Sequence, residues 1–385
     1  MPGFVRLASA AAFAGLFSHA LILLITPASN NEIKRFYASS LGLLGWLPVA
    51  LMLGFFIAIL SIGSVTDRRG KLPAITAGCC AMGAGALLFS QSSSFGLSVA
   101  ATFVMGIGGG LSEGSAMALV SDLYHDRIRT MMMNLSQAAF GLGAVASPLA
   151  IGWLLSAGMS WRLGYVATGA VCLASSVLAF SAWSLRQEKP VADPGLKHDV
   201  HGLLSDRLVL CLAVGILLYV AGEMGQSNWL SIYMRRALNA SRALAAASPS
   251  LMWLGVLLGR LAAAWAAKRM SETAIIIWSL GLAAASQALL LVVKAPLPGL
   301  AAALGLGFFL GPVFPTILSL AGSAYRDRSG GVMSVIVAAG AVGGAVFPLA
   351  IGGLGDLVGI RGALWVCCGV LVADALMFAR LRARS

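Results

Sequence analysis

The chain has 385 residues, of which 59% are hydrophobic and only 10% are charged, and its mean hydropathy is +0.90. Soluble domains carry about 25% charged residues, so this composition excludes a soluble protein and predicts a chain that lies largely within a lipid bilayer. The formal net charge is +12, but the basic residues are scattered over short loops and form no stripe, so we predict no nucleic-acid partner.

Long apolar runs separated by short polar loops occupy almost the whole chain. A helix that spans the bilayer needs about 20 apolar residues, and twelve runs come close to or exceed that length. Their ranges are 6–26, 41–62, 72–91, 96–120, 133–156, 162–184, 208–233, 249–267, 273–293, 298–322, 331–354 and 361–380. We interpret the first run as a span and not as a cleavable signal peptide, because further spans follow it directly.

An even number of spans places both termini on one side of the membrane. Most of the 26 Lys and Arg residues lie in the termini and in the loops on that side, which the positive-inside tendency assigns to the cytoplasm. The longest polar segment, 185–207, contains two prolines and mixed charges, so we predict a cytoplasmic linker. It divides the chain into an N-terminal bundle, residues 1–184, and a C-terminal bundle, residues 208–385.

An internal repeat relates the two halves. Pro148–Gly152 reads Pro-Leu-Ala-Ile-Gly and recurs as Pro348–Gly352, and the Tyr124–Arg127 segment is echoed by Tyr325–Arg328. Parallel repeats of this kind place a substrate site between the halves, near the middle of the bilayer. We therefore predict an all-α membrane protein with twelve transmembrane helices in two pseudo-symmetric six-helix bundles.

The loop between the second and third spans carries a charged motif, Gly63-Ser-Val-Thr-Asp67-Arg68-Arg-Gly70-Lys71. Gly63 allows helices to approach closely, and Gly70 allows a tight reversal without a Cβ clash. Asp67 can pair with a cation or with helix-end amides, while Arg68 and Lys71 favour the cytoplasmic face. The pattern resembles the signature loop of the major facilitator superfamily, and this resemblance implies a gating role for all five residues.

The second half carries a weaker copy of this loop around Gly259-Arg260, inside the eighth span, and Lys268-Arg269, directly after it. We also assign Arg260 to gating, and expect it to pair with a carboxylate or to extend toward the membrane surface.

Further motifs resemble the fucose-permease-like branch of the superfamily: Gly106-x-Gly108-x-Gly110-x-x-Glu113, a polar stretch at 219–233, and Gly311-Pro-Val-Phe-Pro315. This resemblance implies a secondary transporter of sugars or sugar-like solutes that is driven by protons. We expect a monomer without cofactor, metal site or enzymatic activity. The sequence departs from the branch in the first span, which lacks a carboxylate.

Carboxylates inside a span are functional candidates, because an isolated buried charge is costly. Glu113 matches the essential acid of the family's fourth span, and Glu223 lies in the seventh span. His19 is the only titratable group inside the first span, and a histidine can take up a proton near neutral pH. We assign proton coupling to these three residues. For Asp374, in the twelfth span, we expect a structural partner or an extension toward the inner surface.

Glu223 and Gln226 are three residues apart and share a helix face, and Asn228 and Trp229 follow them. A carboxylate, amides and an indole offer hydrogen bonds and a flat apolar surface, which suits sugars and amphipathic solutes. Phe140 stands where the branch carries an asparagine, if Gln137 is the aligned glutamine. The predicted substrate contacts are Trp46, Asn134, Gln137, Phe140, Tyr219, Glu223, Gln226, Asn228 and Trp229.

Three alternatives stay open. The segment Gly143–Pro148 is close to the glycine-proline signature of antiporters, so a proton-antiport exporter of amphipathic compounds is the first. In the second alternative, sodium replaces the proton as the coupling ion. The third alternative is a non-transporting membrane sensor on the same scaffold. The sequence has no nucleotide-binding P-loop, which argues against ATP-driven transport by this chain alone. The short loops favour a bacterial inner membrane.

Overall fold

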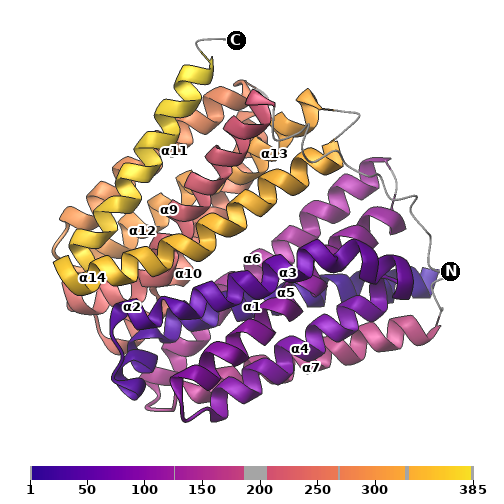
Figure 1. The fold of residues 1–385 in the computed structure, drawn as a ribbon, viewed down its shortest axis with the longest axis horizontal. Coiled ribbons are helices and arrows are strands. Elements are labelled where there is room, and N and C mark those ends of the chain that lie inside the picture. The colour runs from indigo at the N-terminus through magenta and orange to yellow at the C-terminus, as the bar shows by residue number, and fades with distance from the viewer. Residues whose placement is uncertain (1, 125, 186–205, 268, 326–328, 383–385) are drawn as a thin grey trace. The chain divides into compact units, whose positions relative to one another are not determined.

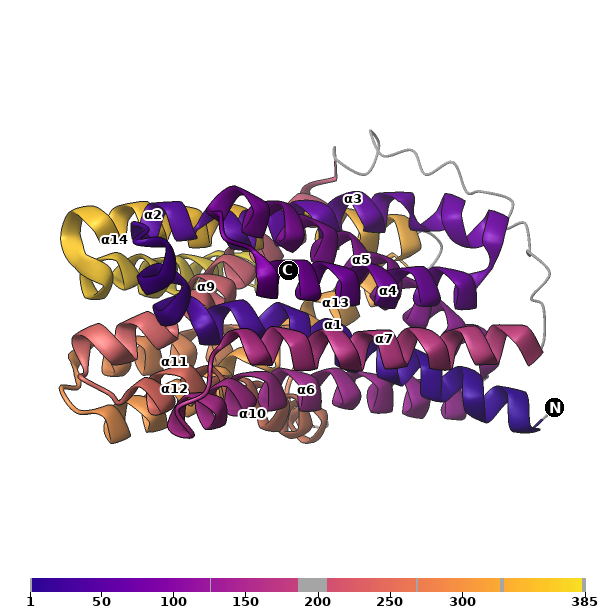
Figure 2. The ribbon, with the colours of Figure 1, turned by 90° about the horizontal axis from the view of Figure 1, so that it is seen from below.

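The computed structural model describes residues 2–124, 126–185, 206–267, 269–325 and 329–382, and every regular element in these ranges is an α-helix (Figures 1 and 2). The earlier helices are α1 (Pro2–Tyr37), α2 (Leu41–Leu44), α3 (Trp46–Arg69), α4 (Lys71–Gln91), α5 (Phe95–Leu123), α6 (Asp126–Ser156) and α7 (Arg162–Leu185). The later helices are α9 (Arg207–Ala237), α10 (Arg242–Ala266), α11 (Glu272–Val292), α12 (Pro296–Leu310), α13 (Val313–Ala324) and α14 (Ser329–Arg382).

Eleven helical segments of the described chain are long and apolar enough to cross a membrane. The second expected span comprises α2 and α3, and the tenth comprises α12 and α13. The eleventh and twelfth spans both lie in α14, whose backbone leaves helical geometry at Gly359, where φ is 79°. All twelve expected spans are therefore present, and the prediction of an all-α membrane fold is confirmed.

Short polar side chains define where several helices begin. The side chains of Ser94, Asp206 and Ser271 accept hydrogen bonds from backbone N–H groups in the first turns of α5, α9 and α11. These N–H groups have no partner within their helix, so the caps fix the helix starts. At α4 the preceding residue is Gly70 with φ 86°, a left-handed conformation that fits the tight reversal expected from the sequence.

The chain forms two compact units. The first contains Met1–Ser29 and Ala50–Leu196, and the second contains Asn30–Val49 and Lys197–Ser385. The chain thus leaves the first unit before α1 ends, contributes residues 30–49 to the second unit, and then returns. We call residues 30–49 the strap. The predicted division at 185–207 places the strap in the N-terminal bundle, and most of that predicted linker lies outside the described residues.

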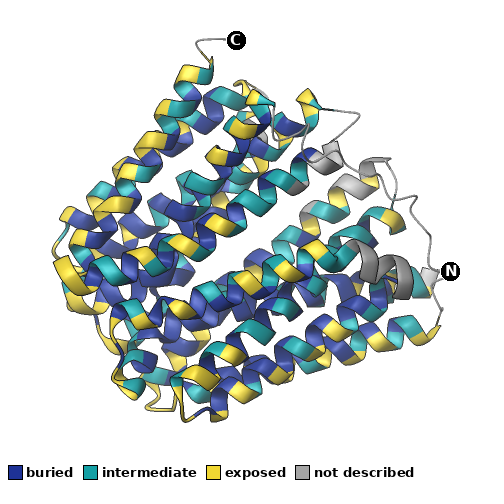
Figure 3. Ribbon diagram, viewed as in Figure 1, coloured by how far each residue is buried: buried dark blue, intermediate teal, exposed yellow. Residues whose placement is uncertain are grey.

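Exposed residues recur along many of the helices (Figure 3), and many of them carry large apolar side chains. Leu60, Trp153 and Val177 in the first unit, and Trp278 and Leu297 in the second, each expose 63–73% of their surface. In water such surfaces would drive aggregation, whereas lipid tails cover them without cost. Burial and composition therefore agree on a membrane setting.

Candidate functional site

The first candidate site lies in the first unit, where α1 and α5 bring His19 and Glu113 together. The Nδ1 atom of His19 lies 2.7 Å from Oε2 of Glu113. This distance is short enough for an ion pair, but the geometry around Nδ1 is not that of a hydrogen bond. The His19 side chain is 4% exposed and that of Glu113 is 28% exposed, so the acid is the more accessible member of the pair.

Aromatic rings enclose the imidazole of His19. The ring of Phe55 stacks on it with centroids 5.4 Å apart, and Phe140 meets it edge-on at 5.8 Å. On α5, Gly109 leaves room for the imidazole, because a Cβ atom there would lie 2.5 Å from Cδ2 of His19. The histidine thus has apolar walls and one acidic neighbour, Glu113.

We expect Gly109→Ala to push the His19 ring away from Glu113. Overpacking of this kind costs about 1–3 kcal/mol, and it would also break the His19–Glu113 contact. The measurement is the thermal stability of the variant together with its solute uptake and any accompanying pH change in liposomes. Gly96→Ala is the matched control, since it lies on the same helix and its added Cβ would meet nothing within 4 Å. Normal coupling in Gly109→Ala would show that the ring position does not matter.

Three predicted substrate contacts also belong to the first unit. Phe140 is 8% exposed and packs against His19. Gln137 is partly exposed, and its amide donates a hydrogen bond to the sulfur of Met117 at 3.4 Å. The side chain of Asn134 lies outside the described residues. Phe140 is therefore part of the His19 site, whereas Gln137 contacts Met117 on α5.

A second polar cluster lies in the second unit, on α9 and α10. The Tyr219 hydroxyl donates a hydrogen bond to Oε1 of Glu223, and both side chains are buried. The guanidinium of Arg260 acts electrostatically on both groups. No ion pair or hydrogen bond of the described residues joins Arg260 to Glu223, so the expected pairing of Arg260 with a carboxylate stays a prediction. Phenol, carboxylate and guanidinium together provide hydrogen-bond donors and acceptors within an apolar bundle.

Two other predicted contacts on α9 bind neighbouring helices in this conformation. Gln226 is fully buried, and its Oε1 accepts a hydrogen bond from Nε2 of Gln287 on α11 at 2.8 Å. Trp229 is 1% exposed and donates to the carbonyl of Pro348 on α14 at 2.9 Å. Gln226 is displaced by about 60° from Glu223 around the helix, because three residues rotate by about 300°. Glu223 and Gln226 therefore contact different partners.

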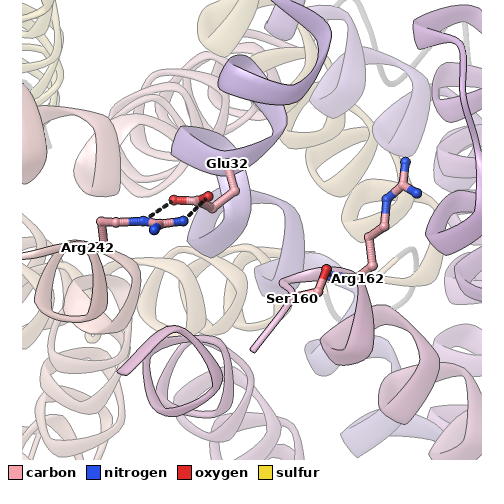
Figure 4. Close-up of polar contacts among 4 residues, drawn as sticks. All are labelled: Glu32, Ser160, Arg162 and Arg242. Carbon is pink, nitrogen blue, oxygen red and sulfur yellow. Dashed lines mark hydrogen bonds and ion pairs between the residues drawn. The ribbon is translucent and has the colours of Figure 1, made fainter. Parts of the chain in front are cut away.

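The strap is fixed to the rest of the second unit by polar contacts that the sequence did not predict. Glu32 and Arg242 form a two-pronged ion pair, with distances of 3.0 and 2.5 Å (Figure 4). Asn30 donates to the carbonyl of Asn228 at 2.6 Å, and Asn31 donates to that of Ser231 at 2.9 Å. The available signal was the run of two amides and one acid, Asn30-Asn31-Glu32, after the first apolar run.

Asp356 fixes the other end of the strap. Its two carboxylate oxygens accept hydrogen bonds from the backbone N–H groups of Leu41 at 2.9 Å and Gly42 at 2.7 Å. Trp46 also belongs to the strap and is 50% exposed. Trp46, a predicted substrate contact, is therefore a half-exposed aromatic side chain of the second unit in this conformation.

The strap contact at Asp356 is expected to resist mild acid. Burial alone would raise the pKa of Asp356, but hydrogen bonds from Gly42, Leu41 and Ser40, with the charge of Lys34, lower it overall. A lowered pKa means that the contact is complete above the ordinary aspartate value, about 3.9, and is lost only as the pH falls below it. Hydrogen-exchange protection of Leu41 and Gly42, corrected for intrinsic rates, should stay constant from about pH 8 to 5. A loss of protection within that range would contradict this assignment.

The structure describes only part of the predicted gating loop. Helix α3 continues through the motif to Arg69, so Gly63 is helical and Gly70 alone forms the reversal. Lys71 forms an ion pair with Asp122 at the end of α5. The side chains of Asp67 and Arg68 lie outside the described residues. Their gating role therefore stays a prediction.

No group of three or more metal-binding side chains comes together among the described residues. The two polar clusters consist of acids, a histidine, a tyrosine and an arginine, and their members are buried or partly buried in apolar helices. Buried groups of this kind in spanning helices are characteristic of membrane transporters, where they bind solutes and ions.

Comparison with known proteins gives the family. The sequence profile of the Major Facilitator Superfamily matches residues 8–222 and 212–385, so the chain belongs to that superfamily and is a transporter, not an enzyme. It is 26% identical over 261 residues to Protein TsgA of Salmonella paratyphi B and, equally, of Salmonella typhi. That match covers 67% of this chain but only 64% of each relative, less than two thirds of their length.

A solved structure has the same fold. It is a bacterial homologue of the human lysosomal transporter Spinster, in an inward-facing and unoccupied conformation. The TM-score is 0.79 over 97% of this chain and 96% of that one, with 14% sequence identity. At this identity the likeness concerns the fold alone. The superfamily predicted from the charged loop is thus confirmed.

Proposed function

We propose that this transporter moves a sugar or sugar-like solute by alternating access and couples it to protons at the His19–Glu113 pair. The observation that carries the proposal is the 2.7 Å approach of Nδ1 to Oε2 inside the membrane-spanning helices. A histidine beside a carboxylate exists as an ion pair or, after protonation of the acid, as a cation beside a neutral acid. One proton therefore changes the attraction between α1 and α5.

The pair explains how the first span works without a carboxylate. The branch that the sequence resembles uses an acid of the first span and an acid of the fourth, whereas here His19 of the first span lies beside Glu113. The partly exposed Glu113 is the group that meets water, and the buried His19 senses its charge. Proton binding at Glu113 would weaken the attraction between α1 and α5, and the bound proton would thereby shift the equilibrium between conformations.

The substrate proposal rests on the cluster of Tyr219, Glu223 and Arg260. Sugar hydroxyls require several donors and acceptors at short range, and this cluster supplies both kinds from α9 and α10. Asn228, 8% exposed and one helical turn beyond Met224, adds an amide to the same helix. We leave Gln226 and Trp229 out of the direct contacts, because both are engaged between helices.

One observation favours the alternative of an exporter for amphipathic compounds. The coupling histidine lies between Phe55 and Phe140, so the first-unit site offers aromatic walls and little hydrogen bonding. Amphipathic cations bind well to such surfaces, especially near an acid such as Glu113. In either case we propose a monomer in a bacterial inner membrane, with both termini in the cytoplasm.

The test uses the purified protein in liposomes that contain a pH-sensitive dye. A panel of sugars, organic acids and amphipathic cations is added with and without an imposed sodium gradient. Acidification driven by a sugar would support the proposal, and a signal with amphipathic cations alone would favour the exporter. Solute flux without any pH change would overturn proton coupling. Binding without flux would point to a sensor.

A further inference from the structure

A third buried acid, Asp374, lies in the second half of α14 and takes no part in the clusters above. It is 0% exposed, and neither carboxylate oxygen has a hydrogen-bond partner among the described residues. None of the ion pairs formed by the described residues includes it. The expectation of a structural partner or an extension toward the membrane surface is therefore wrong.

Asp374 faces α9. Leu371, three residues earlier, packs against Gly222 of α9, and Phe378, four residues later, packs against Gly215 of α9. A Cβ atom on either glycine would clash with these side chains. Residues at these spacings share one side of a helix, so Asp374 lies on the face of α14 that packs against α9.

Few titratable groups lie on the helices that pack against α14. Helix α9 carries Cys211, Tyr219, Glu223 and Tyr233, and its arginines Arg207, Arg235 and Arg236 lie at its two ends. Tyr219 binds Glu223, and Tyr233 donates to the carbonyl of Leu290. Helix α11 carries only Glu272, at its first residue, while α2 and α13 carry none. Arg207 at the start of α9 and Arg380 near the end of α14 are both exposed.

A cavity of about 690 Å³ opens beside this acid, between the start of α9 and the end of α14. Its lining includes Arg207, Leu208, Cys211, Ala373, Met377 and Arg380. Ala373 directly precedes Asp374, and Met377 lies one turn beyond it. The cavity therefore reaches both sides of the position of Asp374 along the helix, while the carboxyl group itself stays sealed.

We propose that Asp374 is a second proton-binding site, which holds its proton in this conformation and exchanges it with water through the cavity between α9 and α14. A carboxylate without any partner inside a spanning helix is far more costly than a neutral acid, so the sealed group carries the proton. When the α9–α14 interface opens, the proton passes from the carboxyl oxygen to a cavity water, and it returns by the reverse step. Only the link to transport rests on the proposed function.

Infrared spectroscopy tests the protonation state directly on the full-length protein. The difference spectrum of wild type minus Asp374→Asn at neutral pH should contain the C=O band of a protonated acid, shifted in D₂O. Carboxylate bands in its place would overturn the proposal. Asp374→Leu is the second variant if the asparagine misfolds, and it should melt at the wild-type temperature or higher, since no partner is lost.

The route is tested by the rate at which this band shifts after transfer to D₂O. Ala373→Phe fills the cavity and should slow the shift at least several-fold. Val372→Phe is the matched control, because Val372 directly precedes Ala373, is 43% exposed and does not line the cavity. Equal rates in the two variants would show that the proton takes another path.

The link to transport is tested by counting protons moved per solute in liposomes. Asp374→Asn should lower the ratio by one, while Glu113→Gln should remove coupling altogether. A wild-type ratio in Asp374→Asn would overturn a role in coupling. If wild type itself moves no protons, the proposed function fails, yet the infrared result still decides whether Asp374 holds a proton.

Discussion

Replacing Glu113 with glutamine is expected to reduce substrate-driven proton uptake to the level of empty liposomes, while exchange of labelled for unlabelled solute continues. Glutamine keeps the shape of the side chain and its place beside His19, but it cannot release or accept the coupling proton. The measurement is dye acidification and solute accumulation in the same liposomes. Both signals should vanish together, and counterflow should stay close to wild type.

Two further variants make this result specific. His19→Gln should lose coupling as well, because it removes the side chain that lies 2.7 Å from the carboxylate of Glu113. Glu272→Gln is the control, because it removes a different carboxylate, at the start of α11. That carboxylate accepts a hydrogen bond from Ser319 on α13. If Glu113→Gln still concentrates solute against a gradient, this pair is not the coupling site.

The second large effect is expected at the strap. Residues 30–49 belong to the second unit but continue at both ends into helices of the first, so the strap is joined covalently to the first unit and is held to the second by its polar contacts. Arg242→Gln leaves Glu32, which is 10% exposed, without its charged partner. Hydrogen bonds to charged groups contribute about 1.5–3 kcal/mol, so amide exchange in the strap should accelerate about 10- to 100-fold.

Hydrogen exchange read by mass spectrometry checks this expectation. Arg35→Gln is the matched control, since Arg35 lies in the same strap and is exposed. The paired variants Glu32→Gln and Arg242→Gln should not add, because each removes the same contact. Transport should respond in parallel, with a changed balance between solute binding from the two sides. Unchanged exchange in Arg242→Gln would mean that the strap is held without this ion pair.

Which of these features the sequence could foretell depends on how local their causes are. The twelve spans follow from the length of the apolar runs, and the superfamily follows from a loop whose residues are contiguous. Glu113, His19 and Glu223 stood out because a titratable group within an apolar run is costly wherever the run packs. These conclusions need no knowledge of neighbours in space.

The partners of these groups were decided only by the tertiary structure. That His19 meets Glu113, that Gln226 binds Gln287 instead of facing an open site, and that Asp374 has no partner among the described residues all depend on helix rotation and depth. The assignment of residues 30–49 to the second unit is of the same kind. Hydrophobic patterning fixes that a helix lies in the membrane, but nearly uniform apolar faces leave its rotation undetermined. Side-chain packing and a few polar contacts between distant residues set that rotation.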